Sequence, residues 1–334
     1  MKNIIKYTLF LALATGLIWF AFKDIPFTDL IAQFQKADYK WVFFVVLLTF
    51  VAHGSRAYRW CMLMEPLGYK PSFYHAYLAV WTGYFANYII PRMGEVTRCG
   101  TLQKTDDVPF EKSFGTVVAE RVFDVITLLV LIGINFILEF DRLSTFFTDL
   151  FSSKLQGGGG GILKWILLAV ILLGGGILSY FIFNKQAREK LLAMPLIKKL
   201  WEFGLGLMDG LLSIRKLKSP AWFIFHTVLI WVMYYFMSYL LFFAVPETSN
   251  LSWLAGLTML VVGAIGMTAP TQGGIGSYHL LVGSVMVLYG LTQKDGILLA
   301  TFTHATQMLT TLIFGAIAFL LVLFAQKDKK ESKA

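Results

Sequence analysis

Hydrophobic positions in this chain gather into long, nearly unbroken runs, each closed by polar or charged residues. A helix needs about 20 apolar residues, at about 1.5 Å per residue, to cross a hydrocarbon core of about 30 Å. Six runs reach about that length, and they cover positions 4–22, 41–60, 114–140, 162–183, 221–245 and 297–324. The pattern therefore predicts an all-α, polytopic membrane protein with about six full transmembrane helices.

The first run has a basic start, which a cleaved signal peptide would also have. It continues through Trp19, Phe20 and Phe22 without a small-residue cleavage site after it. We therefore expect a retained membrane anchor.

The charges between the runs predict an orientation. Positions 184–219 carry eight Lys and Arg residues against three acids, and positions 327–333 are also mostly basic. Such an excess is typical of cytoplasmic segments, whereas 141–161 and 246–250 are poor in cations and are expected outside. The chain is thus predicted as one integral membrane domain, 1–326, with a cytoplasmic amphipathic connector at 184–219 and a basic cytoplasmic tail at 327–334.

Two further apolar stretches, 73–90 and 251–289, do not fit simple crossings. Arg56, Arg59 and Lys70 place the chain inside before the first stretch, and the basic residues of 92–112 place it inside again afterwards. A helical hairpin that enters and leaves by the same face resolves this conflict. For the second stretch, 251–269 and 278–289 should pair as a similar hairpin from the external face. The sequence thus predicts two re-entrant helical hairpins.

Composition supports lipid as the solvent and narrows the chemistry. Hydrophobic residues make up 57% of the chain and charged residues only 15%, well below the roughly one quarter expected of a soluble domain. The net charge of +9 lies in the loops, so we expect contacts with anionic lipid headgroups and not with nucleic acid. Cys61 and Cys99 lack metal-type spacing, and no cofactor motif is present, so neither metal nor cofactor is expected.

The first polar cluster in an apolar context follows the 73–90 stretch. Pro91 and Gly94 break the helix, and Arg92, Glu95 and Arg98 place three charges at the break. The forked guanidinium groups of Arg92 and Arg98 suit a phosphate, with Glu95 orienting one of them. The alternative is an ion-pair network that ends a helix at the membrane surface.

The second cluster lies near the start of the 114–140 run. Glu120 and Asp124 are four residues apart and share one helical face, with Arg121 beside them. Charges inside a spanning helix are costly unless they are paired or face water. They could meet the arginines of the first cluster, or form a structural pair between Arg121 and Asp124 or Glu95.

The third cluster, 268–279, interrupts the second irregular stretch. Pro270 stops one half-helix, and Gly273, Gly274 and Gly276 let the backbone expose a row of amides. Ser277 is expected to cap the next half-helix, whose N-terminus attracts an anion. His279 is either a packing residue or a proton carrier. A polar stripe in the last run is expected to pack here; it comprises Thr303, His304, Thr306 and Gln307.

Three motifs in this order, Pro-Arg-x-Gly-Glu-x-x-Arg (91–98), Glu-Arg-x-x-Asp (120–124) and Pro-x-x-Gly-Gly-x-Gly (270–276), resemble the flippase-like transmembrane region of lysylphosphatidylglycerol synthases and their stand-alone relatives. The resemblance implies a bacterial or archaeal protein that moves a phospholipid or polyprenyl-linked lipid between leaflets. The synthases carry an additional aminoacyl-transferase domain after the membrane part. This chain shows none up to Ala334, so we do not expect it to make lysylphosphatidylglycerol. The family commonly has a glutamate where this chain has His279.

The leading hypothesis is therefore a lipid flippase or transporter of the bacterial inner membrane, with both termini cytoplasmic and membrane lipids as partners. The candidate substrate-binding residues are those of the three clusters: Arg92, Gly94, Glu95, Arg98, Glu120, Arg121, Asp124, Pro270, Gly273, Gly274, Gly276 and His279. A membrane enzyme using Glu95 or Asp124 as base on a lipid-linked substrate is one alternative. A non-catalytic accessory protein is the other, and a homo-oligomer is compatible with all three hypotheses.

Overall fold

The computed structural model describes residues 27–90, 92–142, 217–269 and 271–331, and this part of the chain is helical without strands. Four of its helices are long and apolar enough to cross a membrane. They are α3 (Tyr39–Met64), α6 (Phe110–Leu138), α11 (Pro220–Leu240) and α14 (Gln293–Glu331). The prediction of an all-α, multi-pass membrane protein is confirmed. The predicted spans at 4–22 and 162–183, and nearly all of the connector, lie outside the described residues.

The chain divides into two compact units, one formed by Met1–Asn135 with Ile214–Ala334 and the other by Phe136–Ser213. The contacts that follow all lie within the first unit. Its described part also contains the short helix α2 (Phe27–Lys36) before α3. Short 3-10 turns follow two of the long helices, η1 (Glu65–Leu67) after α3 and η3 (Leu241–Ala244) after α11.

Helices α3 and α11 pack side by side in opposite directions. The start of α3 lies beside the end of α11, where the Asp38 amide donates to the Ala244 carbonyl at 2.8 Å. Further along, Ser55 of α3 donates to the backbone carbonyl of His226 at 3.2 Å, near the start of α11. This antiparallel pair gives the unit two ends, to which the shorter helices can be assigned.

The first irregular stretch folds as a hairpin of α4 (Phe73–Ile89) and α5 (Gly94–Asp106). Its open end is tied by Asp106, whose carboxylate accepts from the Ser72 amide at 2.9 Å and lies 3.0 Å from His75 Nδ1. At its tip the two helices touch through Gly94. A Cβ there would lie 2.5 Å from the Gly83 carbonyl oxygen, so only glycine permits this approach.

The second irregular stretch folds as a hairpin of α12 (Trp253–Thr268) and α13 (Ser277–Met286), which continues into η6 (Val287–Tyr289). Thr258 near the start of α12 contacts the Tyr289 hydroxyl at the end of η6, so this hairpin also begins and ends at one level. The predicted pairing of 251–269 with 278–289 is therefore observed.

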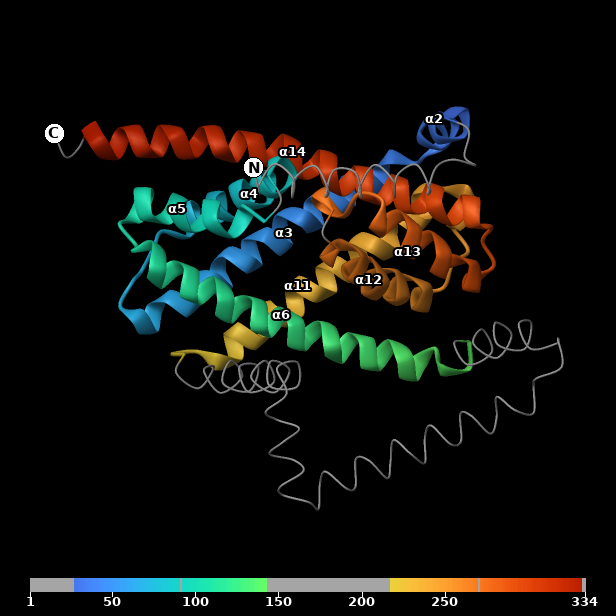
Figure 1. Cartoon of the computed structure of the whole chain (residues 1–334), viewed down its shortest axis with the longest axis horizontal. Coiled ribbons are helices and arrows are strands. Elements are labelled where there is room, and N and C mark those ends of the chain that lie inside the picture. The colour runs from blue at the N-terminus through green and yellow to red at the C-terminus, as the bar shows by residue number, and fades with distance from the viewer. Residues whose placement is uncertain (1–26, 91, 143–216, 270, 332–334) are drawn as a thin grey trace, which may run out of the picture. The chain divides into compact units, whose positions relative to one another are not determined.

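The two hairpins start at opposite ends of α3 and meet at their tips. The first follows the end of α3, whereas the second follows η3 and the turn η4 (Pro246–Thr248), beside the start of α3. Gly273, in the turn η5 (Gln272–Gly274) of the second hairpin, lies against the ring of Tyr88 at the end of α4. Helix α14 runs alongside both hairpins (Figure 1), packing on α4 and on α13.

Candidate functional site

The centre of the candidate site is a pair of buried carboxylates on α6. Glu120 and Asp124 are one helical turn apart and have 0% and 8% of their surface exposed. This spacing places both on the face of α6 that also buries Val117 and Phe123. Two ionised carboxylates at such a position require positive partners, because an unpaired buried charge is strongly destabilising.

Arginines from two helices surround Glu120. Arg98 of α5 donates from Nη2 to one carboxylate oxygen at 2.6 Å, and Arg56 of α3 donates to the other. Arg59, one turn further along α3, lies 3.4 Å from that second oxygen. Through its side chain, Glu120 therefore joins Arg98 of the first hairpin to Arg56 and Arg59 of α3.

Asp124 is held by the same two arginines of α3. Arg59 Nη2 donates to one oxygen at 2.6 Å and Arg56 Nη1 to the other at 2.9 Å. Arg121, on the next residue of α6 after Glu120, lies 3.4 Å from Asp124 and 3.9 Å from Glu95 of α5. We call these seven residues the charge cluster; its members are Arg56, Arg59, Glu95, Arg98, Glu120, Arg121 and Asp124.

Neutral side chains around the charge cluster also contact its arginines. The guanidinium of Arg98 lies 4.0 Å from the ring centre of Trp60, and the Trp60 indole donates to Thr116 at 2.9 Å. Two residues of α11 accept from one further nitrogen each of Arg59 and Arg56. Arg59 donates to the Thr227 hydroxyl at 3.1 Å and Arg56 to the Tyr234 hydroxyl at 3.2 Å. Cation–π contact and charged hydrogen bonds both offset the cost of burying guanidinium groups.

The charge cluster is not electrically balanced. Four arginines face three carboxylates, which leaves a net charge of +1. Only two of its side chains are accessible, Arg121 at 41% and Glu95 at 32% exposed, whereas those of Arg56, Arg59 and Arg98 are at most 4% exposed. An anion that approaches the cluster would therefore meet Arg121 first.

The sequence predicted part of this cluster. It anticipated that Glu120 would meet an arginine of the first break, and the pairs of Arg121 with Asp124 and Glu95 are those proposed as the structural alternative. It did not identify Arg56 and Arg59 as site residues, because arginines near the end of an apolar run are also typical of the cytoplasmic side of a membrane span. Their position inside the apolar run 41–60, where a charge is expensive, was the available signal.

The structure does not bring Arg92 together with Arg98. Arg98 is buried in the charge cluster, whereas Arg92 is exposed at the tip of the first hairpin and has no ion pair or hydrogen bond among the described residues. Its φ of 66° lies in the left-handed region, which non-glycine residues rarely adopt. Gly94 serves the close contact of α4 with α5 described above. Pro91 lies outside the described residues.

The glycine-rich turn of the second hairpin is held by backbone and histidine contacts. Gly273, Gly274 and Gly276 all have positive φ, between 59° and 86°. His304 of α14 donates from Nε2 to the Gly273 carbonyl at 2.8 Å, so the predicted packing of the polar stripe on this turn is observed for His304. Pro270 lies outside the described residues.

His279 takes a structural position at the start of α13. Its Nδ1 accepts from the Gly276 amide at 3.3 Å, and its ring centre lies 5.0 Å from that of His304. The prediction that Ser277 caps this helix is wrong, since Gly276 occupies the N-cap. The Ser277 hydroxyl instead donates to the Gly266 carbonyl at 2.8 Å, tying α13 back to α12.

The described residues contain no group of three or more His, Cys, Asp or Glu side chains placed to hold a metal ion. The two carboxylates of α6 are instead saturated by arginine donors, a set that binds anions and repels cations.

Comparison with known proteins agrees with this architecture. Residues 7–315 match the family described as the lysylphosphatidylglycerol synthase transmembrane region. A UPF0104 membrane protein of the archaeon Methanocaldococcus jannaschii is 30% identical over 125 residues. That alignment covers 36% of this chain and 37% of the archaeal protein. No solved structure matches the chain significantly. Since the family match spans nearly the whole chain, the protein belongs to the family of the lysylphosphatidylglycerol synthase transmembrane region.

Proposed function

We propose that this protein translocates a lipid with an anionic headgroup, a phospholipid or a polyprenyl-linked lipid, between the leaflets of the cell membrane. The observation that carries the proposal is the uncompensated positive charge of the charge cluster, at an edge where Arg121 is accessible. Arginine binds phosphate through two parallel donors, and such charged hydrogen bonds are stronger than neutral ones.

A second accessible arginine supports the same function. Arg92 has no ion pair or hydrogen bond among the described residues; it lies at the tip of the first hairpin, four residues after Tyr88, where the two hairpins meet. An unpaired charge at membrane depth is retained only where it faces water or a ligand. We assign the exposed Arg121 and Arg92 to headgroup binding, while the buried Arg56, Arg59 and Arg98 hold the helices together.

The alternative of a membrane enzyme with Asp124 as base finds less support. Both carboxylate oxygens of Asp124 already accept from arginines, and the carboxylate is 11% exposed. Neither oxygen is free to accept a proton from a substrate. Glu95 stays accessible, but among the described residues it is paired with Arg121 alone, and an arginine does not serve as a second acid or base.

The test is translocation of fluorescent lipids in proteoliposomes that contain the full chain. Arg121→Gln and Arg92→Gln should each lower the rate by about ten- to a hundredfold, because the loss of one charged hydrogen bond costs about 1.5–3 kcal/mol. The matched control is Lys112→Gln, which removes an exposed positive charge at the start of α6. The control should keep the rate of the unaltered protein.

The choice of the exposed Arg121 and Arg92 avoids the three buried arginines of the charge cluster. Arg98→Gln would break a buried pair with Glu120, so a lost rate in that variant would not identify a headgroup contact. Unchanged translocation in a double variant of Arg92 and Arg121 would exclude the proposed role of both. A cytoplasmic position of both termini is part of the same proposal. Labelling of the Ala334→Cys variant from each side of the membrane would check the C-terminal end.

A further inference from the structure

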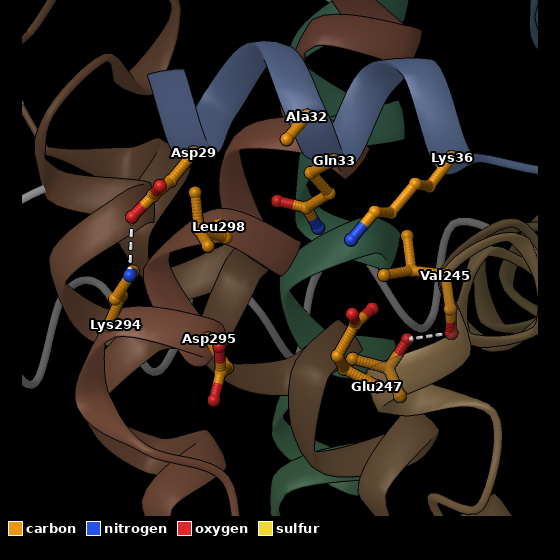
Figure 2. A pocket seen from close by; sticks show the side chains of 10 residues that line it. Asp29, Ala32, Gln33, Lys36, Val245, Glu247, Lys294, Asp295 and Leu298 are labelled. Carbon is orange, nitrogen blue, oxygen red and sulfur yellow. Dashed lines mark hydrogen bonds and ion pairs between the residues drawn. The ribbon is translucent and has the colours of Figure 1, made fainter. Parts of the chain in front are cut away.

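A second polar site lies beside the start of α3, at the opposite end of that helix from η1. It is a pocket of about 210 Å³ between α2, the turn η4 and the start of α14. Figure 2 shows the side chains that line it. They are Asp29, Ala32, Gln33, Lys36, Val245, Glu247, Thr248, Lys294, Asp295 and Leu298. Its volume is below the roughly 300 Å³ at which pockets for drug-sized ligands begin, so it suits a solute or headgroup.

The pocket is distinct from the charge cluster. It adjoins the residues that precede α3, whereas Arg56 lies 17 residues beyond Tyr39, or about 25 Å along the helix. A ligand here would not touch Arg121. The inference below therefore does not rest on the proposed translocation of lipids.

The charges of the pocket are mixed and only partly paired. Lys294 forms an ion pair with Asp29, which neutralises both. The pocket has three other charged side chains, Lys36, Glu247 and Asp295. None of the three forms an ion pair with another described residue. One cation and two anions then leave a net charge of −1. A simple anion such as inorganic phosphate would be repelled, while a group that carries an ammonium would be attracted.

Gln33 provides an independent sign of a ligand. The residue is 8% exposed, and no donor among the described residues bonds to its side-chain oxygen Oε1. In Figure 2 the side-chain amide of Gln33 extends from α2 into the pocket, between Leu298 and Lys36. A buried amide oxygen without a donor is destabilising, and most such groups in native proteins have a partner. The missing partner must be a hydrogen-bond donor.

We propose that this pocket binds a small zwitterion, in which a primary ammonium group is joined to an anionic group. The ammonium carries N–H donors, which suit Gln33 Oε1 and the carboxylate of Glu247, while Asp295, which accepts from the Thr292 hydroxyl, adds to the negative charge of the lining. The anionic end of the ligand would face Lys36, which extends into the pocket from the end of α2. A metal ion fits less well, since the described residues hold no cluster of three potential ligands.

Thermal unfolding of the purified full-length chain in detergent tests this binding, with phosphoethanolamine as the probe. Millimolar phosphoethanolamine should raise the melting temperature, whereas glycerol phosphate, which lacks the ammonium, should not. The same chemistry can come from a lipid, so nanodiscs of phosphatidylethanolamine are compared with nanodiscs of phosphatidylglycerol. Stabilisation by the free probe identifies a soluble ligand, and stabilisation by phosphatidylethanolamine alone identifies a lipid headgroup.

Two variants locate the site. Gln33→Leu and Glu247→Gln should each weaken binding by about tenfold, as expected for the loss of one hydrogen bond to a charged group. Their matched controls are Gln35→Leu, an exposed glutamine of the same helix outside the pocket, and Glu111→Gln on α6. Both controls should bind as the unaltered protein does.

Gln33→Leu should still fold, because it removes an unpaired polar atom from a buried position. An unchanged melting temperature of the unaltered chain with both phosphoethanolamine and phosphatidylethanolamine would overturn the proposal. So would equal stabilisation by glycerol phosphate, or equal weakening by Gln35→Leu.

Discussion

The two hairpins share a topology and differ in their chemistry. Each is a pair of short helices that turns back where it meets the tip of the other. The first hairpin contributes charged side chains, with Arg98 and Glu95 in the charge cluster and Arg92 at the tip. The second contributes backbone groups, which His304 and His279 bind. One break is thus stabilised by ion pairs across helices, and the other by hydrogen bonds to a glycine-rich turn.

The two hairpins accommodate their irregular backbone in different ways. Freed backbone groups must find partners within the protein, because lipid offers none. In the second hairpin, side chains of α13 and α14 supply those partners directly. In the first hairpin, the side-chain oxygen of Asn87 accepts from the Gly94 amide at 2.7 Å. The nearby arginines are then available for other contacts, Arg98 in the charge cluster and Arg92 with a ligand.

The comparison predicts the largest loss of stability in the charge cluster. Glu120→Gln leaves Arg98 and Arg56 without their shared carboxylate, so the free energy of unfolding should fall by about 3–5 kcal/mol. Equilibrium unfolding in mixed micelles measures this value. Glu111→Gln, exposed at the start of the same helix, should change it by less than about 0.5 kcal/mol. Equal effects of the two variants would mean that the cluster does not hold the fold.

A smaller loss is expected at the glycine turn. Gly273→Ala places a side chain at a φ of 59° and only 2.7 Å from the Tyr88 ring, which should cost about 2–3 kcal/mol. The same change at Gly133 of α6, where a Cβ meets nothing within 4 Å, should be neutral or stabilising.

A double variant of Gly273→Ala with Tyr88→Ala sharpens this test. If the tips of the hairpins touch as described, the two losses should not add, since removal of the ring removes the clash. Fully additive losses would place Tyr88 away from the turn.

His304→Leu should cost about 1 kcal/mol, because the Gly273 carbonyl then loses its donor. Hydrogen exchange of the amides at 273–276 should become faster while exchange in α4 stays unchanged. Thr306→Val is the control on the same helix, since its hydroxyl donates to the Phe302 carbonyl within α14. Faster exchange in both variants would indicate general loosening of α14.

The smallest effect on stability is expected at Arg92. Since the side chain is exposed and unpaired among the described residues, Arg92→Gln should change the free energy of unfolding by less than about 0.5 kcal/mol. The same unfolding measurement should therefore separate it clearly from Glu120→Gln. A large loss of stability would show that Arg92 has a structural partner.

The membrane class, the approximate positions of the described long helices and the existence of both hairpins could be predicted from the sequence. These depend on local quantities, the length of an apolar run and the position of Pro, Gly and loop charges, so they can be read along the chain. The motif order likewise indicated the family that the match to residues 7–315 confirms.

The pairing of the charged side chains could not be predicted in full from the sequence and follows from the packing of the helices. Arg56 and Arg59 contact Glu120 and Asp124, which lie more than 60 positions away in the sequence. Arg98 is buried in the charge cluster and Arg92 is exposed outside it, although the two are only six residues apart. The pocket around Gln33 likewise joins three distant segments. The partners of a buried polar group follow from how helices pack against one another, and an apolar run of a given length does not specify that packing.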